Sequence, residues 1–228
     1  MHHGMRVAAA LSFAGCSAAL VNGAVVYSND FEGAVGSEWS STATDVTPVG
    51  ARRFLGQFGN NLVTLSLTNL PAHDTVTVSF DLFVIQSWDG NNATFGPDRW
   101  GFGYADNVQG INGTALLDTN FSNTEEAGQQ QAYPDAFGSG LNNPGGTGSA
   151  ESNSLGYTFF GDSVYSLSFT FAHTDAAIYY GFVGAGLQAL NDESWGLDNV
   201  RVEVSGVPTP GTAVPLGLAG VVALRRRR

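Results

Sequence analysis

The sequence contains no lysine, a single cysteine and few charged residues of either sign. Only 13% of the 228 residues are charged, and 9 arginines supply the basic side chains besides 4 histidines. Because Cys16 has no partner, an internal disulfide and a thiolate-rich metal site are excluded. The span 25–206 holds all 20 acidic residues and 4 arginines, a formal charge of 4 − 20 = −16. Such a charge disfavours nucleic-acid binding and attracts cations such as calcium.

A helical hydrophobic period is also missing between residues 25 and 206. Apolar and polar side chains instead alternate in 75–85 (TVTVSFDLFVI) and 163–172 (SVYSLSFTFA), and the spans 62–67 and 177–183 follow the same pattern. Strands with one apolar and one polar face are typical of antiparallel sheets packed face to face. The sequence therefore predicts an all-β fold, a single two-sheet antiparallel β-sandwich over 25–206.

The motifs that usually carry catalysis are absent as well. The chain has no G-x-S-x-G elbow, no H-E-x-x-H and no E-x-D-x-x-E strand. Carboxylates from different strands could still meet, and two of them about 5 Å apart would suit a retaining glycosidase. We therefore expect a protein that is not an enzyme. The alternative is a secreted polysaccharide-active enzyme, a glycoside hydrolase or lyase, on the same sandwich.

The first 24 residues have the order of a secretory signal peptide. A short basic start precedes the apolar stretch 7–21, and small residues follow at 22–24. We expect export through the Sec translocon, a signal helix over 1–24 and cleavage after Ala24, with Gly23 as the alternative. Two other interpretations stay open: a retained anchor helix, and lipidation of Cys16, because Phe13-Ala14-Gly15-Cys16 resembles a bacterial lipobox.

One segment, 86–104, combines aromatic side chains with amides and carboxylates. Exposed aromatic rings stack on sugar faces, and amides or carboxylates nearby bond the hydroxyl groups, so such a mixture is typical of a sugar-binding loop. The alternative is that Trp100 and Tyr104 belong to the core and the turn residues only turn the chain. The candidate ligand-binding residues are Trp88, Asp89, Asn91, Asn92 and Trp100.

The two ends of the predicted domain carry the clearest candidate for a metal site. The domain starts with VVYSNDFEG and ends with ESWGLDNVRVEV, where the alternation changes parity at 198–199. That slip predicts a β-bulge. First and last strands of such sandwiches are often neighbours, so Asp30, Glu32 and Asp198 are expected to converge. The alternative is that these acids only cap strands at the rim.

The DFEG start and the WGLDNVRV finish resemble the edges of jelly-roll carbohydrate-binding modules and of related concanavalin-like sandwiches. The resemblance covers about 25 residues at the two ends. It implies a jelly-roll topology, possible recognition of polysaccharide, and a structural Ca²⁺ held by the acids at Asp30, Glu32 and Asp198. Calcium takes six to eight oxygen ligands, which carboxylates and backbone carbonyls supply.

The last segment, 207–228, differs in charge from everything before it. An apolar stretch at 213–224 is followed by four arginines. As a short apolar helix this stretch would be roughly 18 Å long, against about 30 Å for the hydrocarbon core of a membrane. The arginines would stay on the cytoplasmic side. We therefore expect transient anchoring in the inner membrane.

This order resembles the PEP-CTERM sorting signal of Gram-negative bacteria, with Thr209 where that signal has Glu. The resemblance implies recognition by an exosortase, a membrane-embedded cysteine peptidase, and release to the cell envelope or an extracellular matrix. The exported protein is expected to act there structurally or by weak glycan binding. The residues that match the signal are Pro208, Pro210, Gly211, Arg225, Arg226, Arg227 and Arg228.

Overall fold

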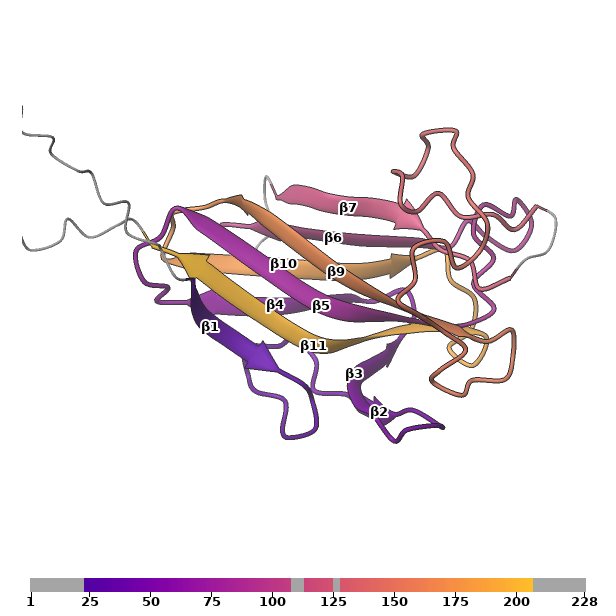
Figure 1. Ribbon diagram of the computed structural model, residues 1–228, viewed down its shortest axis with the longest axis horizontal. Helices are drawn as coiled ribbons and strands as arrows, with labels where there is room; N and C mark the ends of the chain where they lie inside the picture. The colour runs from indigo at the N-terminus through magenta and orange to yellow at the C-terminus, as the bar shows by residue number, and fades with distance from the viewer. Residues whose placement is uncertain (1–22, 108–112, 125–127, 207–228) are drawn as a thin grey trace, which may run out of the picture.

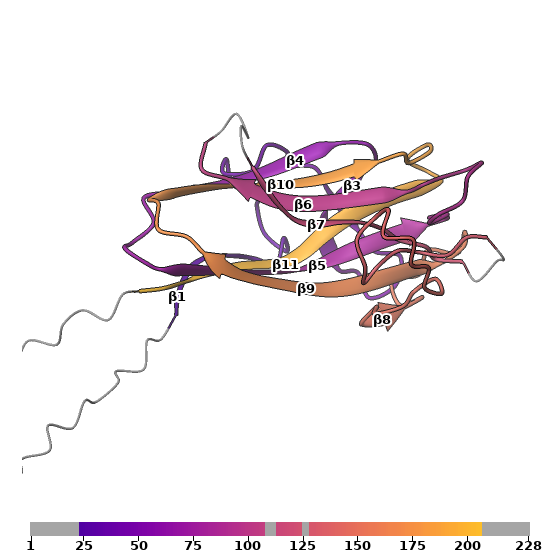
Figure 2. The same cartoon turned by 90° about the horizontal axis from the view of Figure 1, so that it is seen from above.

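The computed structural model describes residues 23–107, 113–124 and 128–206 (Figure 1). Residues 1–22 of the expected signal peptide, which include the lipobox, and the whole sorting tail lie outside these residues. Ala24, the last residue of the expected signal peptide, is the first residue of a strand, Ala24–Asn29. Every regular element in the described part is a β-strand, and the strands form two antiparallel sheets packed face to face (Figure 2). The predicted all-β sandwich is therefore confirmed. The described residues contain no helix long and apolar enough to cross a membrane.

The larger sheet has the strand order β2-β3-β11-β5-β9-β8, and β1 also pairs with β11. The smaller sheet has the order β4-β10-β6-β7. The strands are β1 (Ala24–Asn29), β2 (Thr44–Val46), β3 (Arg53–Phe58), β4 (Leu62–Thr68), β5 (Thr75–Gln86), β6 (Arg99–Ala105), β7 (Thr114–Asn120), β8 (Glu151–Ser152), β9 (Asp162–Ala172), β10 (Ala177–Ala185) and β11 (Glu193–Ser205).

The main core lies between the two sheets and is built from the alternating strands. The apolar side of β5 is fully buried, and Phe80 in its middle meets Phe102 and Phe182 of the smaller sheet at ring-centroid distances of 4.9 and 5.3 Å. Trp100 and Trp195 pack edge to face at 6.0 Å. Large aromatic rings dominate core energetics through the area that they bury. The inward positions of β5, β6 and β10 therefore hold the sheets together.

The first and last strands are neighbours, as expected. β1 pairs with the second half of β11, and β3 pairs with its first half. The predicted bulge is confirmed: Asp198 pairs with Asp81 of β5, and the next pairing of β11 with β5 is Arg201 with Ser79. Asn199 takes a left-handed backbone with φ of 51°. The bulge lets Leu197 and Val200 both point into the core.

The outer face of the larger sheet is only partly polar, in contrast to the expectation of one polar face per strand. Phe83 and Ile85 of β5 point outward and have no exposed surface, because Leu155 covers them together with Phe54 and Val164. This second small core caps the end of the sheet. A strand buried on both sides reads as a continuous apolar run, and the sequence LFVI at residues 82–85 is such a run.

Candidate functional site

The outer face of the smaller sheet carries an open groove of about 480 Å³. Ligand sites in proteins commonly have volumes of roughly 300–1,000 Å³. The groove crosses β4, β10, β6 and β7. Sequence reasoning had placed no candidate residue here. The lining of the groove includes Leu62, Arg99, Gly101, Gly103, Tyr179 and Gly181.

Glycines create the groove because they occupy outward positions in the two central strands. Gly181 of β10 pairs with Gly103 of β6, and Val183 pairs with Gly101. Phe102 lies between the two glycines of β6, and Phe182 follows Gly181; both rings point inward and are buried. The outward side of β6 is thus bare at both glycines, whereas on β10 the bare Gly181 is flanked by Tyr179 and Val183. The result is a hollow whose floor is largely backbone.

The rim of the groove supplies polar and aromatic groups. Arg99 donates from Nη2 to both carboxylate oxygens of Asp118, at 2.8 and 2.7 Å. Its guanidinium also lies over the ring of Phe137, with 4.3 Å between Cζ and the ring centroid. The half-buried Tyr179 stands on one side of the floor, and Leu62, which is 62% exposed, stands on another. A floor that is largely backbone, an aromatic ring and paired charges suit a neutral, hydroxyl-rich ligand.

The segment predicted to bind sugar is arranged differently from a binding loop. Trp88 and Trp100 have no exposed surface, and the indole N–H of Trp88 donates to the Ser194 carbonyl at 2.9 Å. Neither ring is open to stack on a sugar. Trp100 is a core residue, as the alternative interpretation has it, and Trp88 is buried as well. Asp89 is also buried. The half-buried Asn92 accepts the backbone N–H groups of residues 94 and 95 and so shapes a turn, at 2.7 and 3.0 Å.

Asn91 of the same segment belongs to an amide network. Its side-chain NH₂ donates to Asn142, and its side-chain oxygen accepts from Asn120, with 2.5 Å between the atoms in each case. These bonds tie the turn after β5 to the end of β7 and to the loop beyond it. Asn91 thus holds loops together, and the two tryptophans fill the core beside them.

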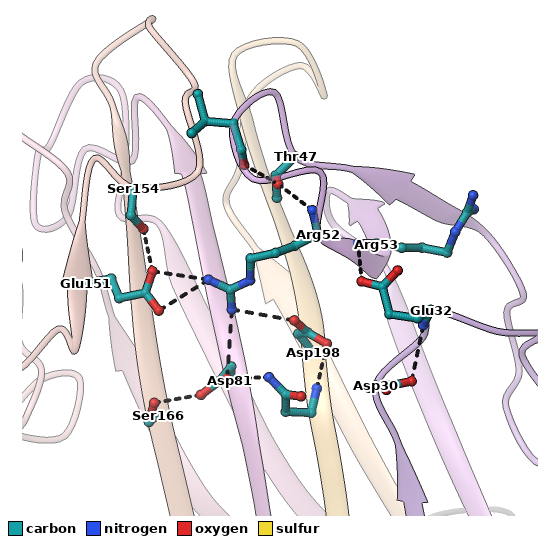
Figure 3. A network of polar contacts seen from close by, with 12 residues as sticks. Asp30, Glu32, Thr47, Arg52, Arg53, Asp81, Glu151, Ser154, Ser166 and Asp198 are labelled. Carbon is teal, nitrogen blue, oxygen red and sulfur yellow. Dashed lines mark hydrogen bonds and ion pairs between the residues drawn. The ribbon is translucent and has the colours of Figure 1, made fainter.

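The three acids of the predicted calcium site lie around one corner of the larger sheet (Figure 3). Each has its own partner. Asp30 accepts the backbone N–H of Glu32 at 3.3 Å, and Glu32 accepts the backbone N–H of Arg53 at 2.9 Å. Asp198 accepts from the Arg52 guanidinium at 3.5 Å. Calcium at Asp30, Glu32 and Asp198 stays a prediction.

Arg52 is the centre of that corner (Figure 3). Its guanidinium binds Glu151 at 3.1 Å, Asp198 at 3.5 Å and Asp81 at 4.0 Å, and it lies 4.7 Å from the centroid of the Phe83 ring. Burial raises the pKa of Asp198 to about 6, and the charge of Asp81 adds to this, whereas Arg52 opposes it. The acidic corner therefore contains a cation of its own.

Two other groups of side chains have ligand atoms within 4.8 Å of one another among the described residues. One consists of Asp89, Asp98 and Glu193, and the other of Asp106, His173 and Asp175. His73 lies beside the second group and contacts His173. Its Nδ1 must donate to the Pro71 carbonyl, 2.6 Å away, because a carbonyl only accepts.

In its neutral form His73 then accepts at Nε2 from His173 Nδ1, at 2.8 Å. The Nε2 atom of a neutral His173 consequently carries a lone pair, and it lies 3.6 Å from the Asp106 carboxylate. Burial lowers the pKa of His173, and the charge of His73 adds to this. This nitrogen can accept a proton or a metal ion.

The chain matches no family model and no curated protein sequence. It does match solved structures. The CBM22-1 xylan-binding domain of Paenibacillus barcinonensis Xyn10C aligns over 83% of this chain and 99% of its own, with 13% identity and a TM-score of 0.41. The carbohydrate-binding module CBM6cm-2 of Cellvibrio mixtus lichenase 5A, solved with cellotriose, aligns over 80% and 99%, with 12% identity and a TM-score of 0.35.

A third match is dimeric latent PorU of Porphyromonas gingivalis. It covers 67% of this chain, which spans only 11% of PorU, with 10% identity and a TM-score of 0.39. At these identities and TM-scores the matches assign no family and carry no functional argument. The argument for function therefore rests on this chain's own residues.

One sequence signal pointed to the groove. In RWGFGYA, the strand β6, glycine alternates with large aromatic residues. A side-chain period of two puts all the aromatics on one face and all the glycines on the other. That pattern marks a bare outer face, but only the pairing with Gly181 of β10 turns it into a groove.

Proposed function

We propose that this chain is an exported β-sandwich that binds a neutral polysaccharide in the groove of its smaller sheet, at the cell surface or in an extracellular matrix. The observation that carries the proposal is the glycine-floored groove beside Tyr179 and the Arg99–Asp118 pair. A sugar ring has an apolar face that stacks on aromatic rings and hydroxyl groups that bond paired charges. The acidic surface disfavours anionic glycans, because like charges repel.

The route to that place is proposed from the two ends of the sequence. The signal-like residues 1–24 would direct the chain to the Sec translocon, and 207–228 would hold it briefly in the inner membrane for an exosortase. We also retain a structural Ca²⁺ at Asp30, Glu32 and Asp198 as a proposal. Against it, Arg52 already neutralises Asp198, so the ion would depend mainly on the exposed carboxylates Asp30 and Glu32.

The enzyme alternative gains no support from the groove. Asp118 is the one acidic residue among the described residues that line it, and its carboxylate is paired with Arg99. Hydrolysis by the usual glycosidase mechanism needs two carboxyl groups flanking the bond. The described residues of the groove therefore fit binding better than cleavage.

The proposal is tested by affinity electrophoresis and calorimetry with soluble polysaccharides: the neutral glycans xylan, laminarin, mixed-linkage β-glucan and galactomannan, with alginate as the anionic comparison. We expect a neutral glycan to bind, and Tyr179→Ala to weaken that binding about tenfold or more, because aromatic side chains supply much of the energy in such sites. Phe159→Ala is the matched control, since Phe159 is 51% exposed and does not line the groove.

Two outcomes contradict the proposal. One is the absence of binding to any neutral glycan in the panel. The other is loss of binding in Phe159→Ala while Tyr179→Ala binds like the parent chain, which would move the site to the loop before β9. Product analysis of the same mixtures checks the alternative, because release of shorter oligosaccharides would make the protein an enzyme.

A further inference from the structure

Three carboxyl groups from separate parts of the chain meet inside one end of the sandwich. Asp89 follows β5, Asp98 precedes β6 and Glu193 is the first residue of β11. Their exposed fractions are 8%, 0% and 0%, and one carboxylate oxygen of each lies within 4.8 Å of those of the other two. Acidic side chains are almost never fully buried unless they are paired. We call these three residues the buried acid triad.

Hydrogen bonds from the described part of the chain reach only one carboxylate oxygen each of Asp98 and Glu193 in the buried acid triad. Asp98 accepts the backbone N–H of Asp89 with Oδ2, and Glu193 accepts the backbone N–H of Gln188 with Oε2 at 2.6 Å. The other two oxygens, Asp98 Oδ1 and Glu193 Oε1, are buried and receive no hydrogen from any described residue. Leaving a buried acceptor without a partner costs roughly 1–3 kcal/mol, and more when it is charged.

The charges that act on these two residues are all negative. Burial raises the pKa of Asp98 to about 7 and that of Glu193 to about 9. The charge of Asp89 contributes to both increases, and Asp98 and Asp192 act on Glu193 in the same direction. Only a positive species in the middle removes this repulsion. It can be a proton shared by Asp98 and Glu193, or a metal ion.

We propose that the buried acid triad binds one calcium ion, with Asp98 Oδ1 and Glu193 Oε1 as two of its ligands. The donor atoms decide the class of ion. The triad offers only carboxylate oxygens, which hard cations prefer, and no imidazole or thiolate that would favour zinc or copper. Three carboxylates also exceed the charge of one divalent ion by a single unit, so the ion neutralises most of the triad.

The site is separate from the corner at Asp30, Glu32 and Asp198. At that corner Arg52 supplies the positive charge. The buried acid triad lies instead at the ends of β5, β6 and β11 that face the loops. Asp98 directly precedes Arg99, which lines the groove. A bound ion would tie the β5–β6 turn to β11 and would thereby hold the chain that leads into Arg99. The proposal does not depend on glycan binding.

The test uses the full chain after chelation, with calcium added back. Calorimetry at pH 7.5 is expected to show calcium binding, and thermal unfolding is expected to shift upward by about 5–10 °C at roughly 100 times Kd. Glu193→Gln should abolish both effects while its calcium-free melting temperature stays at or above that of the parent, because an amide resembles the protonated carboxyl. Asp98→Asn is the second variant, in case Glu193→Gln does not fold.

Glu32→Gln is the matched control, because it changes a carboxylate of the other acidic corner. It should keep the response to calcium. Three results overturn the proposal. If calcium neither binds nor stabilises the parent chain, the positive species in the triad is the proton shared by Asp98 and Glu193. A response that survives in both Glu193→Gln and Asp98→Asn would place the ion elsewhere. A response lost only in Glu32→Gln would assign it to the Asp30, Glu32 and Asp198 corner.

Discussion

The two sheets of this sandwich share one alternating pattern but have outer faces of opposite character. On the larger sheet, outward side chains satisfy one another: Arg52 gathers three carboxylates, and Leu155 covers Phe83. On the smaller sheet, the central outward positions are glycines and the face stays open. The comparison teaches that inward residues build the fold, whereas outward residues decide whether a face is closed for stability or open for a ligand.

The largest expected effect is on the closed face. Arg52→Ala removes the guanidinium that pairs with Asp198, a residue that is only 4% exposed. The Asp198 carboxylate is then left beside the like charge of Asp81. We expect the free energy of unfolding to fall by about 3 kcal/mol, while glycan affinity is unchanged. Urea unfolding of the variant measures the loss. A change below about 0.5 kcal/mol would show that the network contributes like an ordinary surface ion pair.

An intermediate effect is expected when the open face is filled. In Gly181→Val the added Cβ would point into the groove and meet only Leu62 Cδ1, at 3.4 Å, which is ordinary contact. Valine also suits a strand better than glycine. The variant should therefore unfold within about 1 kcal/mol of the parent and lose most of its affinity for glycan.

Thr77→Val provides the control for that variant, because it introduces a valine on the outer face of the larger sheet, away from the groove. It should bind glycan as the parent does. Undiminished binding by Gly181→Val would place the glycan outside the groove and would remove the functional contrast between the two faces.

The smallest effect concerns pH. The folded pKa of Asp198 is raised to about 6, so between roughly pH 4 and 6 the folded chain holds a proton that the unfolded chain has released. This residue therefore makes the protein less stable as pH rises through that window. Asp198→Asn removes its contribution, so the melting temperature of the variant should fall less between pH 4.5 and 6.5 in the presence of chelator. Parallel profiles for the two proteins would contradict the raised pKa.

The sequence predicted those features that depend on local pattern. The alternation of apolar and polar residues predicted strands at β5 and β9, and the change of parity at 198–199 predicted the bulge in β11. The sequence left open whether Trp100 belongs to the core or to a ligand-binding surface, because hydrophobicity alone does not distinguish an aromatic ring that is buried from one that is exposed. Features that need several strands in register were missed. The groove needs β6 beside β10, and the buried acid triad joins residues from three separate segments.

The central claim, that the open face of the smaller sheet binds glycan, is tested most directly by backbone amide chemical shifts. The isotope-labelled chain would be titrated with an oligosaccharide of the neutral glycan that binds best. The account predicts that the largest shifts occur at Gly101, Gly103 and Gly181, with little change at Arg52 or Asp81. Shifts concentrated on the outer face of the larger sheet or on the Phe159 loop, with none at the three glycines, would contradict it.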